Sequence, residues 1–150
     1  MVELVLGLFL FILTGSFILE RWLDLKNMRH TVTELPDELK DVYDDEAYRK
    51  SQLYKRENTR FSFYSGTFSL VVMVAAILLG FFGLLDRYLA EQTDSYYLLV
   101  LLFFGILMLA SDILTIPFDL WDTFKIEEKF GFNKTTPKTF VFDKLKGWLL

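Results

Sequence analysis

The side chains of this 150-residue chain that could do chemistry are carboxylates, amides and hydroxyls, with one histidine and no cysteine. The lack of cysteine excludes disulfides and thiol catalysis. A catalytic zinc usually takes three protein ligands, but His30 is alone and no His-Glu-x-x-His stretch occurs. A serine nucleophile would have only His30 or a carboxylate as its base. We therefore expect no catalytic residue, metal site or cofactor in this chain, and we interpret His30 as an ordinary surface residue.

Asp112 is the acid that stands closest to lipid in the predicted membrane segments. Acids inside membrane segments mark candidate functional sites. Asp112 lies five residues before Pro117, which is about 7 Å along a helix. Two interpretations stay open: the carboxylate reaches water at the cytoplasmic end of a span, or it faces a water-filled cavity within the membrane.

The elements that would position these residues follow from the separation of charged and apolar sequence. No charge occurs from Leu4 to Leu19, from Phe61 to Leu85, or from Ser95 to Ser111. About 20 helical residues cross the hydrocarbon of a bilayer. A buried helix of a soluble bundle usually keeps a polar stripe, and the segment 70–85 has none. We predict an all-α, polytopic membrane helical bundle with three transmembrane helices, at about 3–22, 61–85 and 95–116.

The basic residues predict the orientation of these spans. Nine of the 16 Lys and Arg residues lie within 20–60, one lies within 86–94, and six follow Pro117. Because Lys and Arg accumulate on the cytoplasmic side, we place the loop 23–60 and the tail inside the cell. The N-terminus and the segment 86–94 then face outward. The net charge of −4 gives no support for a nucleic-acid surface.

The loop between the first two spans is expected to be helical. Pro36 followed by Asp37 and Glu38 is typical of a helix N-terminus, and a second start is expected at Asp44 or Asp45. No proline occurs from Glu46 to Leu85. We therefore predict one helix that leaves the cytoplasm and continues into the membrane.

The segment 117–146 is predicted to be an interfacial helix and connector. Pro117 is expected to interrupt the third span, and an amphipathic helix is expected beyond it. Gly131 can end that helix. The residues 147–150 are expected to begin a fourth span. We single out these residues as structural or substrate-path candidates: Asp112, Glu127, Glu128, Gly131, Phe132, Asn133, Lys134, Thr135 and Pro137.

Two blocks of the sequence resemble the N-terminal membrane region of the type I CAAX prenyl proteases, which are integral-membrane zinc metalloendopeptidases. One block comprises Pro36, Glu38, Leu39, Tyr48, Lys50, Ser51, Gln52, Tyr54, Phe61 and Ser62. The other comprises Pro117, Phe124, Glu127, Glu128, Gly131, Phe132, Asn133, Lys134, Thr135, Thr136, Pro137, Asp143 and Lys146.

The resemblance implies a bundle of seven membrane helices around a water-filled chamber. It also implies a zinc held by two histidines of His-Glu-x-x-His and a later glutamate, with the intervening glutamate as general base. Those residues would follow Leu150, so we expect this chain to be the non-catalytic N-terminal domain, inactive alone, of a zinc-containing parent. Its expected partners are the lipid bilayer, the C-terminal catalytic part, and a peptide or prenylated-peptide substrate, with no nucleic acid.

Two other functions stay open. The chain could be a freestanding membrane interaction or scaffold protein that lacks the protease half, or a small transporter or channel subunit that uses Glu3 and Asp112. The gene beyond codon 150 distinguishes the protease domain from the scaffold protein. A further span followed by His-Glu-x-x-His supports the protease, and a stop codon supports the scaffold. The expected location is the endoplasmic reticulum membrane in a eukaryote, or the cytoplasmic membrane in a bacterium.

Overall fold

The computed structural model describes residues 1–30, Leu35 and residues 44–149. Every regular element in these ranges is a helix, which confirms the predicted all-α fold. The expected helix start at Pro36 lies outside the described residues. The elements are α1 (Val2–Arg29), α2 (Asp45–Leu78), α3 (Phe81–Ala90), α4 (Tyr96–Trp121), the π-helix η2 (Asp122–Glu127) and α5 (Pro137–Leu149).

Three helical stretches of the described chain are long and apolar enough to cross a membrane: Val2–Arg29, Asp45–Leu78 and Tyr96–Glu127. Their large apolar side chains are mostly exposed, as Phe11 at 74% and Phe104 at 65% illustrate. Water would be a poor solvent for such extended apolar surfaces, whereas lipid covers them without cost. The described residues therefore have the surface of a membrane protein and a small apolar core.

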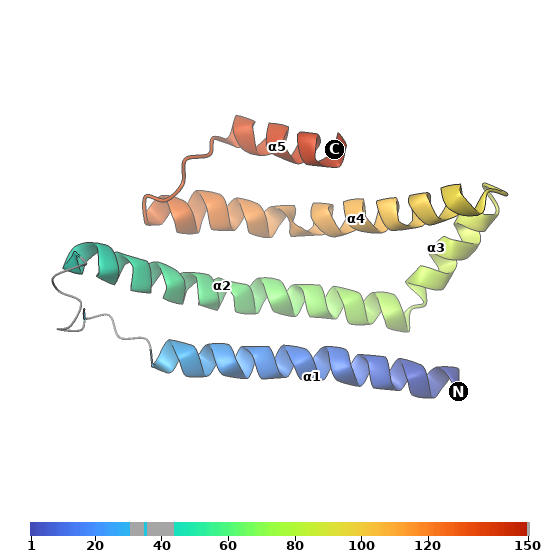
Figure 1. Ribbon diagram of the computed structural model, residues 1–150, viewed down its shortest axis with the longest axis horizontal. Coiled ribbons are helices and arrows are strands. Elements are labelled where there is room, and N and C mark those ends of the chain that lie inside the picture. The colour runs from blue at the N-terminus through green and yellow to red at the C-terminus, as the bar shows by residue number, and fades with distance from the viewer. Residues whose placement is uncertain (31–34, 36–43, 150) are drawn as a thin grey trace. The chain divides into compact units, whose positions relative to one another are not determined.

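The chain divides into two compact units, Met1–Ala75 and Ala76–Leu150. The first unit contains α1 and most of α2, which run antiparallel (Figure 1). The backbone N–H of Ala47 donates to a carboxylate oxygen of Asp44 at 2.8 Å, so Asp44 caps the start of α2 as the sequence predicted.

Arg21 joins α1 to α2. Its guanidinium donates to the Ser62 hydroxyl at 2.9 Å and pairs with Asp24 on its own helix at 3.2 Å. It also lies over the rings of Phe17 and Phe63. A Cβ atom on Gly66 would stand 3.3 Å from the Phe17 ring. The lack of a side chain at Gly66 therefore lets Phe17 approach the backbone of α2.

The second predicted span is interrupted, and the prediction of one helix from Glu46 to Leu85 is wrong at its C-terminal end. Helix α2 stops at Leu78 and α3 begins at Phe81. Gly80 between them has a φ of 68°, in the left-handed region that glycine adopts without steric cost. Proline was not needed for the break, because a left-handed glycine alone ends a helix.

The third long helix runs further than the sequence predicted. Pro117 lies inside α4 instead of ending it, and the helical path continues through η2 to Glu127. Proline removes one main-chain hydrogen bond and usually bends a helix, yet membrane helices tolerate it. The expectation that Pro117 interrupts the span is therefore wrong, and the chain first turns at Gly131.

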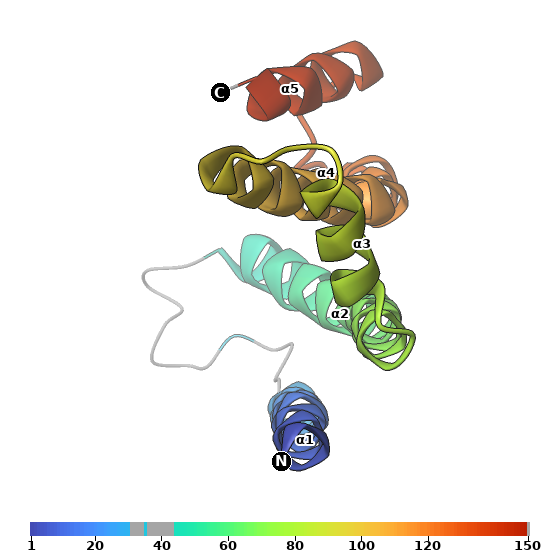
Figure 2. The same ribbon diagram turned by 90° about the vertical axis from the view of Figure 1, so that its right-hand side faces the viewer.

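In the second unit, α5 returns along α4 with the opposite direction, and both views place the two helices side by side (Figures 1 and 2). Residues 128–136 connect η2 to α5. This arrangement faces α5 toward the acidic residues of α4, and it creates the site described next.

Candidate functional site

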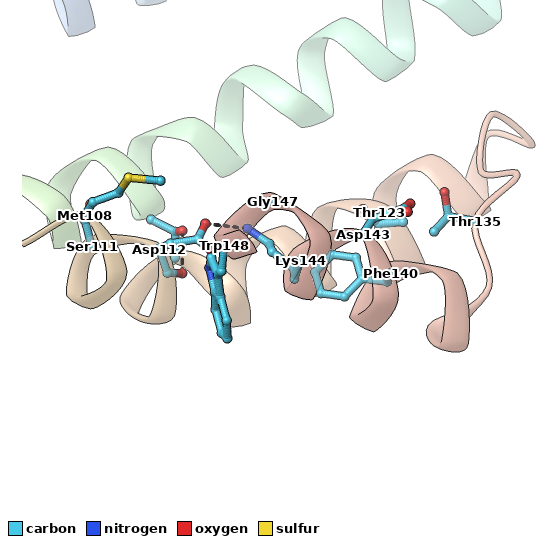
Figure 3. A pocket seen from close by; sticks show the side chains of 11 residues that line it. Met108, Ser111, Asp112, Thr123, Thr135, Phe140, Asp143, Lys144, Gly147 and Trp148 are labelled. Atoms are coloured by element: carbon cyan, nitrogen blue, oxygen red, sulfur yellow. Dashed lines mark hydrogen bonds and ion pairs between the residues drawn. The ribbon is translucent and has the colours of Figure 1, made fainter. Parts of the chain in front are cut away.

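A pocket of about 600 Å³ lies between α4, η2 and α5, and we call it the α4–α5 pocket. Polar and apolar side chains share its lining, as Figure 3 shows. The lining residues are Met108, Ser111, Asp112, Thr115, Thr123, Thr135, Phe140, Asp143, Lys144, Gly147 and Trp148. Polar groups on an otherwise apolar membrane helix are costly to place, so their concentration here marks the pocket as the candidate site.

Lys144 and Asp112 form the central polar contact of the pocket. The Lys144 ammonium lies 2.6 Å from one carboxylate oxygen of Asp112 and 2.8 Å from Asp119. The indole N–H of Trp148 donates to the other Asp112 oxygen at 2.6 Å. The Lys144 and Asp112 side chains are 24% and 28% exposed, so the pair is shielded from water only in part.

Helical spacing explains why these residues meet. Phe140, Lys144 and Trp148 are four residues apart, so they lie on one face of α5. Asp112 and Asp119 are seven apart, so they lie on one face of α4. The Phe140 ring meets the edge of Phe124 with centroids 6.0 Å apart. One aromatic contact and one ion-pair network thus fix α5 against α4 and η2.

The electrostatics of the pocket favour a charged lysine. Hydrogen bonds that Lys144 donates to Asp112 and then to Asp119 raise the pKa of its ammonium, and this outweighs the effect of burial. Lys144 is therefore a fixed cation at neutral pH. With Asp143 also at the rim, acidic groups still outnumber basic ones in the lining.

The connector after η2 is held by short-range hydrogen bonds. Gly131 has a φ of 68°, which lets the chain turn back. The carbonyl of Glu127 accepts from the N–H groups of Phe132 at 2.9 Å and Asn133 at 3.3 Å. The Asn133 amide donates to the Glu128 carboxylate at 2.8 Å, and its carbonyl accepts from the Thr135 N–H at 2.6 Å.

The start of α5 is also capped. The Thr136 hydroxyl accepts from the backbone N–H of Thr139 at 3.2 Å, as an N-cap residue does. Pro137 is the first helical residue, a position where its missing N–H leaves no bond unmade. The connector is thus a defined turn that delivers α5 to α4.

The structure divides the candidate residues into two groups. Asp112 and Thr135 line the α4–α5 pocket. The rest belong to the connector and its ends, namely Glu127, Glu128, Gly131, Phe132, Asn133, Lys134 and Pro137. Lys134 is exposed, and no ion pair to Glu127 or Glu128 is found for it in the described chain.

Sequence reasoning missed the residues that face Asp112 from α5. Lys144 and Trp148 are 32 and 36 positions away from it. The spacing of four between them was a usable signal for a shared helix face. Nothing in the sequence, however, shows which face of α5 turns toward α4, so the pairing becomes visible only in the fold.

The described residues do not fit a catalytic metal site. Within residues 1–30, 35 and 44–149, no three side chains of His, Cys, Asp or Glu are grouped so that they could hold an ion. The pocket hydroxyls of Ser111, Thr123 and Thr135 have no imidazole beside them to act as a base. The pocket offers hydrogen bonds and charge to a ligand.

The fold and the pocket define a polytopic α-helical membrane protein with a polar cavity among its helices. Residues 24–150 match the family model described as "CAAX prenyl protease N-terminal, five membrane helices". The chain belongs to the CAAX prenyl protease family.

Curated relatives and a solved structure support this assignment. A CAAX prenyl protease 1 homolog of Caenorhabditis elegans is 34% identical over 115 residues, which are 77% of this chain and 25% of the relative. The Homo sapiens homolog is 32% identical over 134 residues, with 80% and 27% covered. The crystal structure of S. mikatae Ste24p matches with a TM-score of 0.79 and 29% identity, covering 98% of this chain and 35% of that one. The chain therefore spans about a quarter to a third of these proteins.

Proposed function

We propose that this chain is the N-terminal, non-catalytic membrane part of a CAAX-type zinc endopeptidase, and that its α4–α5 region helps form the intramembrane chamber and substrate entrance. The α4–α5 pocket carries the proposal. It places charged and hydroxyl side chains beside a helix that is apolar enough to span a membrane. Such an arrangement is expected where a membrane helix borders water.

The pocket favours one of the two interpretations of Asp112. A carboxylate that only reached bulk water at a helix end would need no partner. Asp112 instead has both oxygens engaged, by Lys144 and by Trp148, at the wall of the cavity. We infer that it borders the chamber, with Lys144 offsetting the cost of its charge.

The catalytic part of the parent would lie elsewhere in the longer protein. The zinc that the family implies would be held there, since the described residues offer no ligand set. The names of the relatives, CAAX prenyl protease 1 homologs, point to a prenylated substrate. We propose a peptide or prenylated peptide as substrate, the bilayer and the catalytic part as partners, and the endoplasmic reticulum membrane as the location in a eukaryotic host.

The test uses the complete product of the gene, reconstituted in lipid vesicles, with peptide cleavage and thermal melting measured together. Thr123→Leu fills part of the pocket and removes a hydroxyl. We expect cleavage to fall about tenfold through misplacement of the substrate, with little change in melting. Thr67→Leu, the same change on an exposed face of α2, is the matched control and should leave both unchanged. Equal cleavage by both variants would contradict a role for the pocket in the substrate path.

The connector is tested in the same assay. Asn133→Ala removes two hydrogen bonds that hold the turn. Because Asn133 is partly exposed, we expect a loss of about 1–2 kcal/mol of stability and a cleavage loss in proportion. Lys134→Ala removes an exposed charge without such bonds and should change neither. If Lys134→Ala lowers cleavage and not melting, the connector contacts substrate, and its role is more than structural.

The freestanding scaffold protein remains the second candidate. It predicts a stop codon after codon 150 and a chain that is stable and membrane-inserted by itself. A reading frame that continues into further spans and His-Glu-x-x-His would contradict the scaffold and support the protease.

A further inference from the structure

A second pocket, of about 460 Å³, lies between α1 and α2, and we call it the α1–α2 pocket. Leu25 and Met28 of α1 and Arg60, Phe63 and Tyr64 of α2 line it. All five belong to the unit Met1–Ala75. The walls are apolar or aromatic, and Arg60 is the charged residue of the lining.

Arg60 differs from the neighbouring Arg21 in its surroundings. Arg21 is 19% exposed, and its guanidinium is engaged by Asp24 and Ser62. Arg60 is exposed, and no acid is found within ion-pair distance of it in the described part of the chain. Arg21 therefore serves the packing of the helices, whereas the charge of Arg60 is exposed at the pocket.

The charge pattern of the sequence predicts that the pocket lies at the depth of lipid headgroups. Arg60 is the last charged residue before the uncharged stretch 61–85. On α1, Trp22 marks the same boundary, and the Lys26 ammonium stands 4.2 Å from its ring centroid. Tryptophan and basic residues gather at membrane interfaces, where phosphates are the nearest anions.

We propose that the α1–α2 pocket binds an anionic glycerophospholipid. The phosphate lies against Arg60 beside Leu25 and Met28, and the first part of an acyl chain runs along Phe63 toward the uncharged stretch 61–85. Basic pockets between membrane helices bind such headgroups. A free phosphate would use the arginine and leave the apolar wall in water, so the wall favours a lipid. This site is independent of the proposed protease function.

The experiment measures lipid binding to the full chain in detergent by native mass spectrometry. Phosphatidic acid is the probe, phosphatidylcholine the neutral comparison, and glycerol 3-phosphate the soluble competitor. We expect Arg60→Gln to weaken phosphatidic acid binding about fivefold, the effect of one basic residue at an anionic surface. Arg60→Lys should keep most of the binding. Arg87→Gln, the same change at an exposed arginine of α3, is the matched control and should bind as the parent does.

The apolar wall has its own test. Met28→Trp fills the pocket without changing charge, and we expect it to weaken binding at least as much as Arg60→Gln does. Helicity and melting without lipid check that each variant folds. Equal binding of phosphatidylcholine, equal losses in Arg60→Gln and Arg87→Gln, or an unaffected Met28→Trp would each overturn the proposal. If glycerol 3-phosphate displaces phosphatidic acid when both are present at equal concentration, the proposal would be overturned in favour of a phosphate site.

Discussion

At the residue scale, Lys144 carries the polar contact between α4 and α5. Its ammonium lies 2.6 Å from Asp112 and 2.8 Å from Asp119, and so serves both acids as a shared cation. An ion pair on an open surface contributes little, whereas removal of one partner from a buried pair leaves an uncompensated charge. The partial burial of this pair places its contribution between those limits.

The first prediction concerns Lys144→Met in the full chain. We expect a loss of about 1–3 kcal/mol at pH 7, because the acids of α4 lose their cation. Because the folded protein raises the pKa of Lys144, this contribution is fully present below the unfolded pKa of about 10.4, and it disappears as pH rises through the folded value. The melting difference between parent and variant should stay constant from about pH 7 to 9 and shrink above about pH 10.4.

Lys146→Met is the control for that measurement. Lys146 is exposed, two residues further along α5, and should tolerate the change at every pH. A melting difference for Lys144→Met that shrinks between pH 7 and 9 would contradict the raised pKa. Equal melting of the two variants at pH 7 would contradict the structural role of the ion pair.

At the element scale, Gly80 decides where the second long helix ends. A Cβ atom at Gly80 would meet nothing within 4 Å, so no packing forbids a side chain there. The constraint is the φ of 68°, which an L-residue other than glycine adopts only with strain. The position of the break therefore depends on the backbone and not on a neighbour.

The second prediction follows from this difference. Gly80→Ala should destabilise the full chain by about 1–2 kcal/mol, because alanine is strained in the left-handed region. Gly83→Ala, inside α3 and equally free of neighbours, should be neutral or stabilise by up to about 1 kcal/mol. Thermal melting in detergent compares the two. If both alanines stabilise, the break at Gly80 is not fixed in solution and the two helices join into one.

At the scale of the whole molecule, charged and apolar residues occupy different parts of the chain. The apolar helices expose side chains that suit lipid, and the basic residues gather in 20–60 and after Pro117. Nine Lys and Arg residues precede the second span within 20–60, and one follows it within 86–94, and this difference predicts the orientation.

The third prediction tests that orientation by labelling. The chain has no cysteine, so Ala47→Cys at the start of α2 and Gln92→Cys between α3 and α4 each introduce one reactive thiol at an exposed position. In sealed vesicles, an impermeant maleimide should reach the two thiols from opposite sides, Gln92→Cys from outside the cell. Disrupted vesicles, in which both should react, are the control. Labelling of both from one side would contradict the predicted span between them.

The sequence alone determined the helical class, the number of long apolar segments and the family, because these depend on composition along the chain and on local motifs. For the same reason it placed the start of α2 at Asp44 or Asp45, where Asp44 is the cap, and a helix end at Gly131. The predictions for the end of α2 and for the path of the chain at Pro117 were wrong. A single glycine can be accommodated in a helix or can end it, and proline in a membrane helix leaves the chain free to continue.

Only the tertiary structure showed which side chains Asp112 contacts. Its partners are 32 and 36 residues away, and they reach it because the turn at Gly131 sends α5 back along α4. The same holds for the α1–α2 pocket, whose walls come from two different helices. Periodicity identifies the face of a helix, but it does not name the opposing helix, because that choice depends on packing between residues far apart in sequence.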